Sequence, residues 1–458
     1  MDPAANESPP QQDPVAANEW VAADDWPTHP EIETHERCNL LLLATHQIVL
    51  RVGWIFKTES VIMPAFLDSI AGAGWIRGFL PVLNRFGQSL PPVFCAGYLR
   101  VMRQKKLALA AFVVLMSLPF GLLSLAWLAG GSQNRVWMPW LFMALYGIFF
   151  VFNGLYHLSF GTVQGKLIRP ARRGRLLLIS TFYGSLPAML AAWWLLDGWL
   201  KMPDGGYGYI FGFTSVCFLL SGLTVLLLSE PGDDPVARDP ASEPKSSLSD
   251  TWAALRGDRN LRRLVTVAVL FGSSLIVFPH YQSLAREELG LTGTHLMIWV
   301  ITQNAAVGVF SMFVGPLADA WGNRFTLRVL VFSSAVAPLL AAVLPQLAGG
   351  IGGQLFWIVF VALGVVPLVL RILANYALEI CPSDEHPRYL STVSLCLAIP
   401  FLFSPAIGWI VDLVGADVVF LATAALTIMG GLLTFRLDEP RHRVLGGKPG
   451  PVGAGGDE

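Results

Sequence analysis

The chain has 458 residues, of which 54% are hydrophobic and 14% charged, and its mean hydropathy is +0.55. Soluble domains carry about a quarter charged residues, so this composition excludes an ordinary soluble protein and is typical of a membrane protein. The net charge of −1 gives no electrostatic reason to expect a nucleic-acid partner. The five cysteines form no CxxC pair and lie in or beside apolar runs, which favours free thiols. We expect no metal and no cofactor.

Both ends of the chain differ from the rest. Residues 1–37 are acidic and rich in proline, and they hold no lysine or arginine before Arg37. With little to bury, this segment is predicted to be a disordered acidic tail. It lacks the basic start and apolar core of a signal peptide. Residues 438–458, rich in glycine and proline, are predicted to be a second tail.

Twelve apolar segments between the tails are long enough to cross a bilayer, which takes about 20 residues each. The last two are separated only by a short turn around Gly415. One long interruption, 230–262, becomes helix-like after Ser249 and Asp250, which can cap a short amphipathic helix. The segments begin near positions 38, 75, 106, 136, 175, 207, 263, 294, 326, 352, 388 and 416.

The sequence therefore predicts an all-α membrane protein with twelve transmembrane helices in two six-helix bundles. The first bundle covers 38–229 and the second covers 263–437, with 230–262 as the linker. Most of the 31 lysines and arginines lie in the even-to-odd connections, the linker and the C-terminal tail. Because cytoplasmic connections are rich in Lys and Arg, we expect both termini and the linker in the cytoplasm, with the protein in the cytoplasmic (inner) membrane. The opposite side holds few basic residues: Arg77, Arg135, Lys201 and Arg286.

The connection between segments 8 and 9 carries a charged motif, "GPLADAWGNRFTLR" at 315–328. Its Gly315, Asp319, Gly322 and Arg324 resemble the Gly-x-x-x-Asp-Arg-x-Gly-x-Arg motif of the major facilitator superfamily of secondary transporters. Ala320 replaces the usual basic residue. We name these four matching residues the gating motif.

The resemblance covers about residues 38–437 and includes other stretches. Two departures leave the subfamily open. The 2–3 connection, "CAGYLRVMRQKK", has no acidic residue where the motif requires one, and segment 4 lacks the arginine motif associated with proton antiport. The further similar stretches are "RPARRGR" at 169–175, "CPSDEHPRYL" at 381–390 and "SPAIGWIVD" at 404–412.

Each residue of the gating motif has a physical role to test. Gly315 would let segment 8 approach a neighbouring helix closely, and Gly322 suits a turn with positive φ. The resemblance implies that Asp319 faces the start of segment 5, near Gly174, only while the cytoplasmic side is closed. The alternative is a turn with solvated charges.

The resemblance also implies that segments 1, 4, 7 and 10 line a central cavity. Ionisable side chains within spans are costly when they face lipid, so a water-filled site is their expected location. Such residues are Arg51, Lys57, Glu59, Arg85 and Arg371. For Lys57 the alternative is an ammonium group that extends to the membrane surface. The substrate-binding candidates are Arg51, Asn153, His157, His280, Arg371 and Asn375, although both histidines could instead be packed polar residues.

Glu59 and Arg85 form a second candidate site. Segments 1 and 2 run antiparallel around a turn near residue 72, and these two residues are equally far from it. They are therefore expected at similar depth, where they can form a proton-coupling site or a permanent buried ion pair. Glu59 and Lys57 are two residues apart on one helix, so we expect them not to pair.

The predicted function is secondary transport of a small solute by alternating access. The excess of positive charge within the spans favours an anionic or carboxylate-bearing substrate, and proton coupling is an option. The alternatives are an exporter of amphipathic compounds and a transporter-like sensor or scaffold without flux. No GxSxG, HExxH or P-loop motif is present, so we do not expect an enzyme. The expected partners are the lipid bilayer and the solute, and we expect a monomer.

Overall fold

The computed structural model describes residues 30–72, 74–130, 136–168, 172, 175–176, 179–232, 248–347, 350–381 and 386–439. In these ranges the regular elements are helices. Eleven runs of helix have the length and composition to cross a membrane, and α3, with 28 residues, has the length for a twelfth crossing. The protein is thus the all-α, multi-pass membrane protein predicted from the sequence. The tail predictions for residues 1–29 and 440–458 lie outside the described residues.

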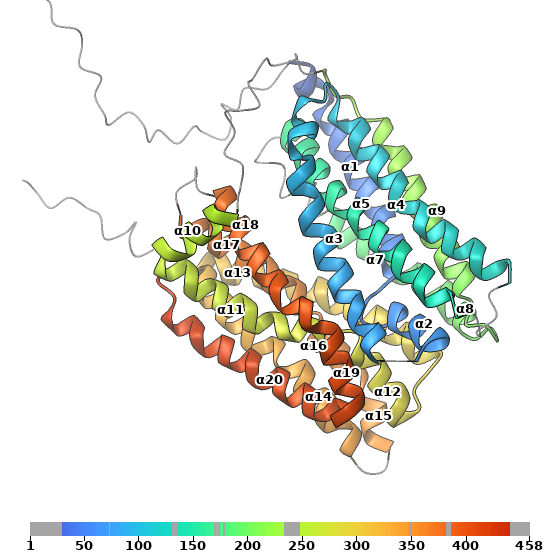
Figure 1. Ribbon diagram of the computed structural model, residues 1–458. Coiled ribbons are helices and arrows are strands. Elements are labelled where there is room, and N and C mark those ends of the chain that lie inside the picture. The colour runs from blue at the N-terminus through green and yellow to red at the C-terminus, as the bar shows by residue number, and fades with distance from the viewer. Residues whose placement is uncertain are drawn as a thin grey trace, which may run out of the picture.

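The N half, residues 30–232, contains the first six crossings (Figure 1). Its first and fifth crossings are each built from more than one helix. The elements are α1 (Pro30–Ile55), α2 (Ile62–Ile70), α3 (Gly74–Val101), α4 (Lys105–Leu128), α5 (Met138–Leu167), η2 (Ile179–Tyr183), α7 (Gly184–Ala191), η3 (Ala192–Leu196), α8 (Asp197–Leu200) and α9 (Tyr207–Leu226).

The C half, residues 248–439, contains the other six crossings and begins with the short helix expected in the linker, α10. The elements are α10 (Leu248–Gly257), α11 (Arg259–Ile276), α12 (His280–Leu289), α13 (Thr294–Ser334), α14 (Val336–Val343), η5 (Leu344–Gln346), α15 (Ile351–Leu355), α16 (Trp357–Leu363), α17 (Val366–Glu379), α18 (His386–Ala398), η8 (Ile399–Phe403), α19 (Ser404–Val414), α20 (Ala416–Leu433) and η9 (Thr434–Arg436).

Two glycines separate crossings that follow each other closely in the chain. Gly415 has φ +93° between α19 and α20, where the sequence predicted a short turn. Gly322 has φ +84° and ψ 159° inside α13, so crossings 8 and 9 meet there at a sharp bend. A side chain with a Cβ rarely adopts such φ values, which explains glycine at both positions. The positive φ expected at Gly322 is confirmed.

Two boundaries differ from the sequence-based expectation. First, α1 begins at Pro30, so the last residues of the predicted tail are helical. Second, crossing 1 is not one helix, because α1 ends at Ile55 and α2 begins at Ile62. Crossing 7 is interrupted in the same way, between α11 and α12. Discontinuous helices in transporters bring backbone groups and polar side chains to the middle of the membrane.

The two halves meet at one end of the molecule and diverge toward the other (Figure 1). We call the end where α1 begins and η9 ends the tail face, and the opposite end, with α2 and α12, the far face. At the far face α3 packs against α19 through small residues. A Cβ on Gly78 would lie 2.5 Å from the carbonyl oxygen of Ser404, and a Cβ on Gly408 would overlap the carbonyl of Gly74. Glycine therefore permits the backbones to touch.

This packing predicts that Gly408→Ala weakens the far-face contact, because the new methyl group would overlap α3. We expect several-fold faster labelling of a Ser283→Cys thiol by a membrane-impermeant maleimide, with native Cys38 replaced by serine. Ser283 is 2% exposed at the far face and would become accessible if the halves separate. Gly308→Ala is the matched control, since a Cβ there meets no other atom. Equal labelling rates in both variants would contradict this role for Gly408.

Candidate functional site

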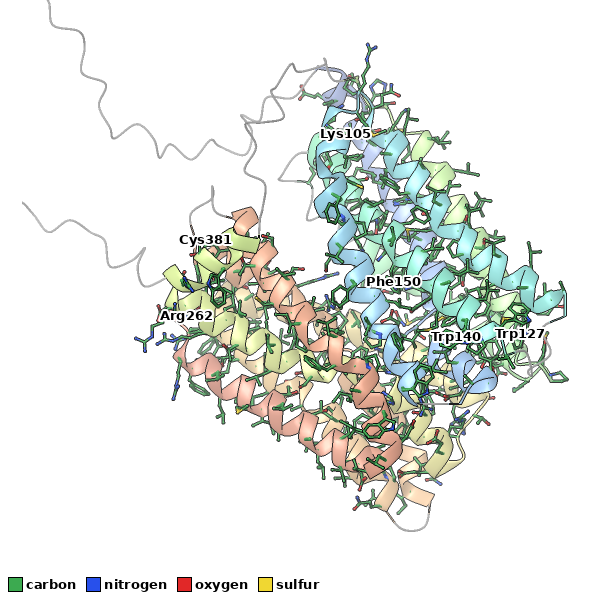
Figure 2. All side chains as sticks on the ribbon, in the orientation of Figure 1. Lys105, Trp127, Trp140, Phe150, Arg262 and Cys381 are labelled. Atoms are coloured by element: carbon green, nitrogen blue, oxygen red, sulfur yellow. The ribbon has the colours of Figure 1, made fainter. Side chains whose placement is uncertain are left out.

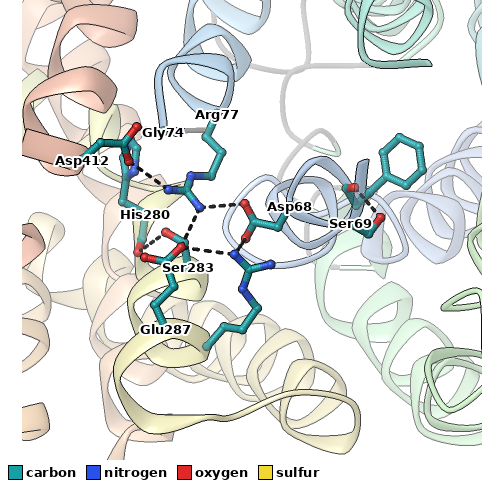
Figure 3. Close-up of polar contacts among 10 residues, drawn as sticks. Asp68, Ser69, Gly74, Arg77, His280, Ser283, Glu287 and Asp412 are labelled. Carbon is teal, nitrogen blue, oxygen red and sulfur yellow. Dashed lines mark hydrogen bonds and ion pairs between the residues drawn. The ribbon is translucent and has the colours of Figure 1, made fainter. Parts of the chain in front are cut away.

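A network of charged side chains joins the halves at the far face (Figure 3). Its centre is Arg77 of α3, whose side chain is only 2% exposed. Arg77 Nη1 lies 2.7 Å from Asp68 Oδ1 and 3.2 Å from Glu287 Oε1, and Nη2 lies 3.5 Å from Asp412 Oδ1. Asp68 and Arg77 belong to the N half, while Glu287 and Asp412 belong to the C half. One guanidinium therefore links both halves.

Two further contacts extend this far-face network. Arg286 Nη2 lies 3.4 Å from Asp68 Oδ2, and the backbone N–H of Gly74 donates to Asp412 Oδ2 at 2.8 Å. Asp68 is fully buried and has a cation from each half within ion-pair distance. Desolvated charges remain stable when they are paired and hydrogen-bonded in this way. The network stabilises contact between the halves at the far face.

His280 lies beside this network rather than in a central site. It is the first residue of α12 and has no exposed surface, and both ring nitrogens are buried without a hydrogen-bond partner. It is close enough to Arg77 for the two to interact electrostatically. The sequence grouped His280 with Arg51 and Arg371 because it lies in crossing 7. The break after α11 places the residue at the far face, and its assignment as a substrate-binding residue stays a prediction.

Arg51 of α1 and Arg371 of α17 lie on facing sides of the two halves. They are close enough to repel each other electrostatically. Neither forms an ion pair with a described residue, and Arg51 Nε is buried without a hydrogen-bond partner. Arg371 is exposed, and its charge acts on Arg51 of the other half. Two like charges without a counter-charge form a region of positive potential between the halves.

The remaining predicted binding residues divide into two groups. Asn375 is exposed one turn beyond Arg371 on the same face of α17, as the spacing predicted. His157 of α5 is also exposed and interacts electrostatically with Lys57. Asn153, one turn earlier, is completely buried, and neither its Nδ2 nor its Oδ1 has a partner. A buried amide with no hydrogen bond is costly, which makes Asn153 a functional candidate.

Glu59 does not pair directly with Arg85. Instead Asn84 Nδ2 and the Tyr146 hydroxyl each donate to Glu59 at 2.7 Å, and Gln88 in turn donates to Asn84. Arg85 lies over the ring of Phe401 in the C half, with Cζ 5.1 Å from the ring centroid. The sequence argument placed Glu59 and Arg85 at a similar depth, and Asn84, the residue before Arg85, does contact Glu59. Arg85 itself does not pair with Glu59, which lies in the non-helical segment 56–61, where helical geometry does not apply.

Lys57, two residues before Glu59, is enclosed by aromatic rings. Its Nζ lies 3.4 Å from the ring centroid of Trp54, 4.5 Å from that of Phe149 and 4.6 Å from that of Phe150. Phe150 lies in the interior of the N half (Figure 2). Lys57 is 1% exposed, so the alternative that it extends to the membrane surface is wrong. Cation–π contacts stabilise a desolvated ammonium group, and the charge of Glu59 acts on it as well.

Residues 276–454 match the family model described as the Major Facilitator Superfamily. The matched residues are less than half of the chain and include the motif at 315–328. Among curated proteins, none matches its sequence.

Three solved structures of transporters are similar in fold. A variant of the nucleoside transporter NupG has a TM-score of 0.66 and 12% identity, over 88% of this chain and 100% of that one. The D-xylose-proton symporter has a TM-score of 0.65 and 14% identity, over 88% and 98%. A bacterial homologue of the human lysosomal transporter Spinster, inward-facing and unoccupied, has a TM-score of 0.61 and 11% identity, over 93% and 100%. These similarities show the fold.

The structure describes only part of the gating motif. A Cβ at Gly315 would meet no other atom, so in this conformation the predicted close approach of a neighbouring helix is absent. Arg324 Nη2 donates to the carbonyl of Phe435 at 3.1 Å. The side chain of Asp319 and the residues around Gly174 lie outside the described part of the chain. The predicted contact of Asp319 with crossing 5 therefore stays a prediction.

Sequence reasoning missed the far-face network. Arg77 and Arg286 were treated only as charges that set the orientation. Asp412 was part of the similar stretch "SPAIGWIVD", which is the one signal that could have singled it out. Asp68 and Glu287 carry no motif, and their partners in the other half lie far away in the chain.

We predict that Arg77→Gln lowers the apparent unfolding temperature by several degrees. The substitution leaves Asp68 buried without its closest cation, and breaking a buried ion pair costs about 3–5 kcal/mol. Adding Asp68→Asn should restore part of the loss, because no unpaired charge then remains buried. Lys201→Gln is the control, since Lys201 pairs with Asp197 at an exposed position. Equal effects of Arg77→Gln and Lys201→Gln in a thermal unfolding assay would contradict a stabilising network.

Proposed function

We propose that the protein is a secondary transporter that moves a small anionic, carboxylate- or phosphate-bearing solute by alternating access. The observation that carries the proposal is the repulsive pair of Arg51 and Arg371, held between the halves without an acidic partner among the described residues. Keeping two guanidinium groups near each other without a counter-charge is unfavourable. A bound anion would offset that cost, and the planar fork of arginine suits carboxylate and phosphate groups.

Nearby polar residues support recognition of the same solute. Asn153 and His157 share one side of α5 at adjacent turns, and Asn375 follows Arg371 on α17. We propose that they supply neutral hydrogen-bonding groups for the solute. A solute that touches Arg51 and Arg371 together contacts both halves, so its binding depends on how the halves are arranged. That dependence is what alternating access requires.

The basic residues of the tail face support a cytoplasmic location for both termini. Exposed arginines there include Arg256 and Arg259 at the start of the C half. With this orientation the present arrangement is closed to the outside by the far-face network. We propose that the protein functions as a monomer in the cytoplasmic membrane.

We predict that Arg371→Lys impairs transport at least tenfold despite keeping the positive charge, because lysine cannot form two parallel hydrogen bonds to one anion. The solute is first selected by a thermal-shift screen of carboxylates and phosphate esters, since a ligand of the native state raises stability. Uptake of that solute into proteoliposomes is then compared for wild type and variant. Arg256→Lys on exposed α10 is the control.

Several outcomes would contradict this proposal. Wild-type uptake by the Arg371→Lys variant would remove Arg371 from the binding site. Stabilisation by apolar cations rather than anions would favour export of amphipathic compounds. Binding without flux in wild type would favour a sensor or scaffold.

Proton coupling through Glu59 extends the proposal. Glu59 and Lys57 are opposite charges in the non-helical segment 56–61, where crossing 1 can change shape. Glu59 is held by Asn84 of α3 and Tyr146 of α5. Movement of that segment would break these hydrogen bonds and change the environment of the carboxylate, so protonation would be linked to conformation. The alternative is that the same contacts permanently connect crossings 1, 2 and 4.

Glu59→Gln separates these two possibilities. Under coupling, we expect the variant to lose gradient-driven accumulation but to keep solute binding and exchange. Under the structural alternative, it should lose stability and all transport modes together, because Lys57 is left without its nearest negative charge. Tyr146→Phe is the control, since it removes one hydrogen bond and no charge. A Glu59→Gln protein that still concentrates solute with a proton gradient would exclude Glu59 as the coupling residue.

A further inference from the structure

A basic hollow lies at the tail face of the C half, away from the Arg51–Arg371 region. It encloses about 380 Å³ between the start of α11 and the end of α20, which pack side by side. Figure 2 marks this corner by Arg262, which extends outward from α11. The lining combines three guanidinium groups with one hydroxyl and one apolar side chain: Arg259, Arg263, Thr266, Leu433 and Arg436.

The spacing of these residues along their helices places their side chains on the same side. Arg259, Arg263 and Thr266 follow each other at intervals of four and three, so they share one face of α11. Arg436 of η9 lies three residues after Leu433 of α20. Helix α11 is capped by Asp258, which accepts from the N–H groups of Asn260 and Leu261. The cap fixes where the helix starts and therefore where its first arginine lies.

Positive charge exceeds negative charge in this basic hollow. Arg263 Nη1 lies 3.3 Å from Asp438 Oδ1, and both side chains are partly exposed. Within the described residues, Arg259 and Arg436 form no ion pair. An exposed site with an excess of arginines favours an anion that accepts several hydrogen bonds, such as a phosphate group. The hydroxyl of Thr266 donates to the carbonyl of Arg262, which leaves its oxygen free to accept.

The hollow lies at the level where a bilayer has its headgroups. Its arginines are at the ends of two crossings, Arg259–Leu289 and Ala416–Arg436. Beside it, Leu432 is 57% exposed and Phe435 is 54% exposed, so an apolar surface continues from the hollow along α20. On neighbouring α10, Trp252 is 57% exposed. Tryptophan and arginine together are typical of a membrane–water interface.

From this arrangement we infer that the basic hollow binds the phosphate headgroup of an anionic phospholipid from the leaflet at the tail face. Arg259 and Arg436 supply the charge that Asp438 does not neutralise, and Arg263 completes the contact. Leu433 and the apolar surface of α20 lie where the acyl chains would run. A free phosphate ion has the same headgroup chemistry but gains nothing from that apolar surface. The lipid would bind the C half independently of the transported solute.

The test measures lipid binding to the full-length protein in detergent. Short-chain phosphatidylglycerol is titrated, and the bound fraction is read by native mass spectrometry, with phosphatidylcholine of the same chain length for comparison. We expect tighter binding of phosphatidylglycerol to wild type. Arg259→Gln and Arg436→Gln should each weaken it about fivefold, as expected for one arginine near an anionic headgroup. Arg259→Lys/Arg436→Lys should keep most of the affinity, because both charges remain.

Arg256→Gln on α10 is the matched control, since it removes an exposed arginine at the same face outside the hollow. It should change affinity less than twofold. Equal binding of both lipids, or unchanged binding by Arg259→Gln and by Arg436→Gln with a wild-type unfolding temperature, would overturn the inference. Displacement of phosphatidylglycerol by equimolar inorganic phosphate would assign the site to a free anion and overturn the lipid as its ligand.

Discussion

A charge removed from water is stable only when an opposite charge or several hydrogen bonds compensate it, and this constraint organises the whole molecule. At the far face it is satisfied between Arg77 and carboxylates from both halves, with Asp68 fully buried. The glycine contact of α3 with α19 brings the backbones close enough for these ions to meet. The ions and the glycine contact together hold the halves at the far face. From there the halves diverge toward the tail face (Figure 1).

The same constraint distinguishes the Arg51–Arg371 region from the far face. Arg51 and Arg371 repel each other and have no acidic partner among the described residues. Glu59 and Lys57 are compensated locally, by hydrogen bonds and by aromatic rings. Under the proposed function, a solute bound between the halves would supply the negative charge that these arginines lack. The interruption of crossing 7, by contrast, places His280 at the far face.

Much of the fold could be predicted from local pattern, because span length, basic connections and glycine turns are properties of neighbouring residues. Gly322, Gly415 and the Arg371–Asn375 spacing belong to this class. The break at 56–61 was not predicted, although the polar run Lys57–Ser60 lies within crossing 1. The contacts of Glu59 could not be derived from helical spacing, because Glu59 lies where helical geometry stops. In the sequence, nothing distinguishes three charged residues of the far-face network from ordinary loop charges, because only the fold places them in contact: Asp68, Arg286 and Glu287.

The central claim is that the halves exchange contact at the far face for contact at the tail face. Pulsed electron spin resonance on two spin-label pairs tests it most directly, with one pair at Ser69 and Glu288 and the other at Leu107 and Arg256. Each pair has one label on either half. Introducing Arg77→Gln should lengthen the far-face distance and shorten the tail-face distance in the same sample. A far-face distance that changes while the tail-face distance stays fixed, or two distances that lengthen together, would contradict alternating access in this protein.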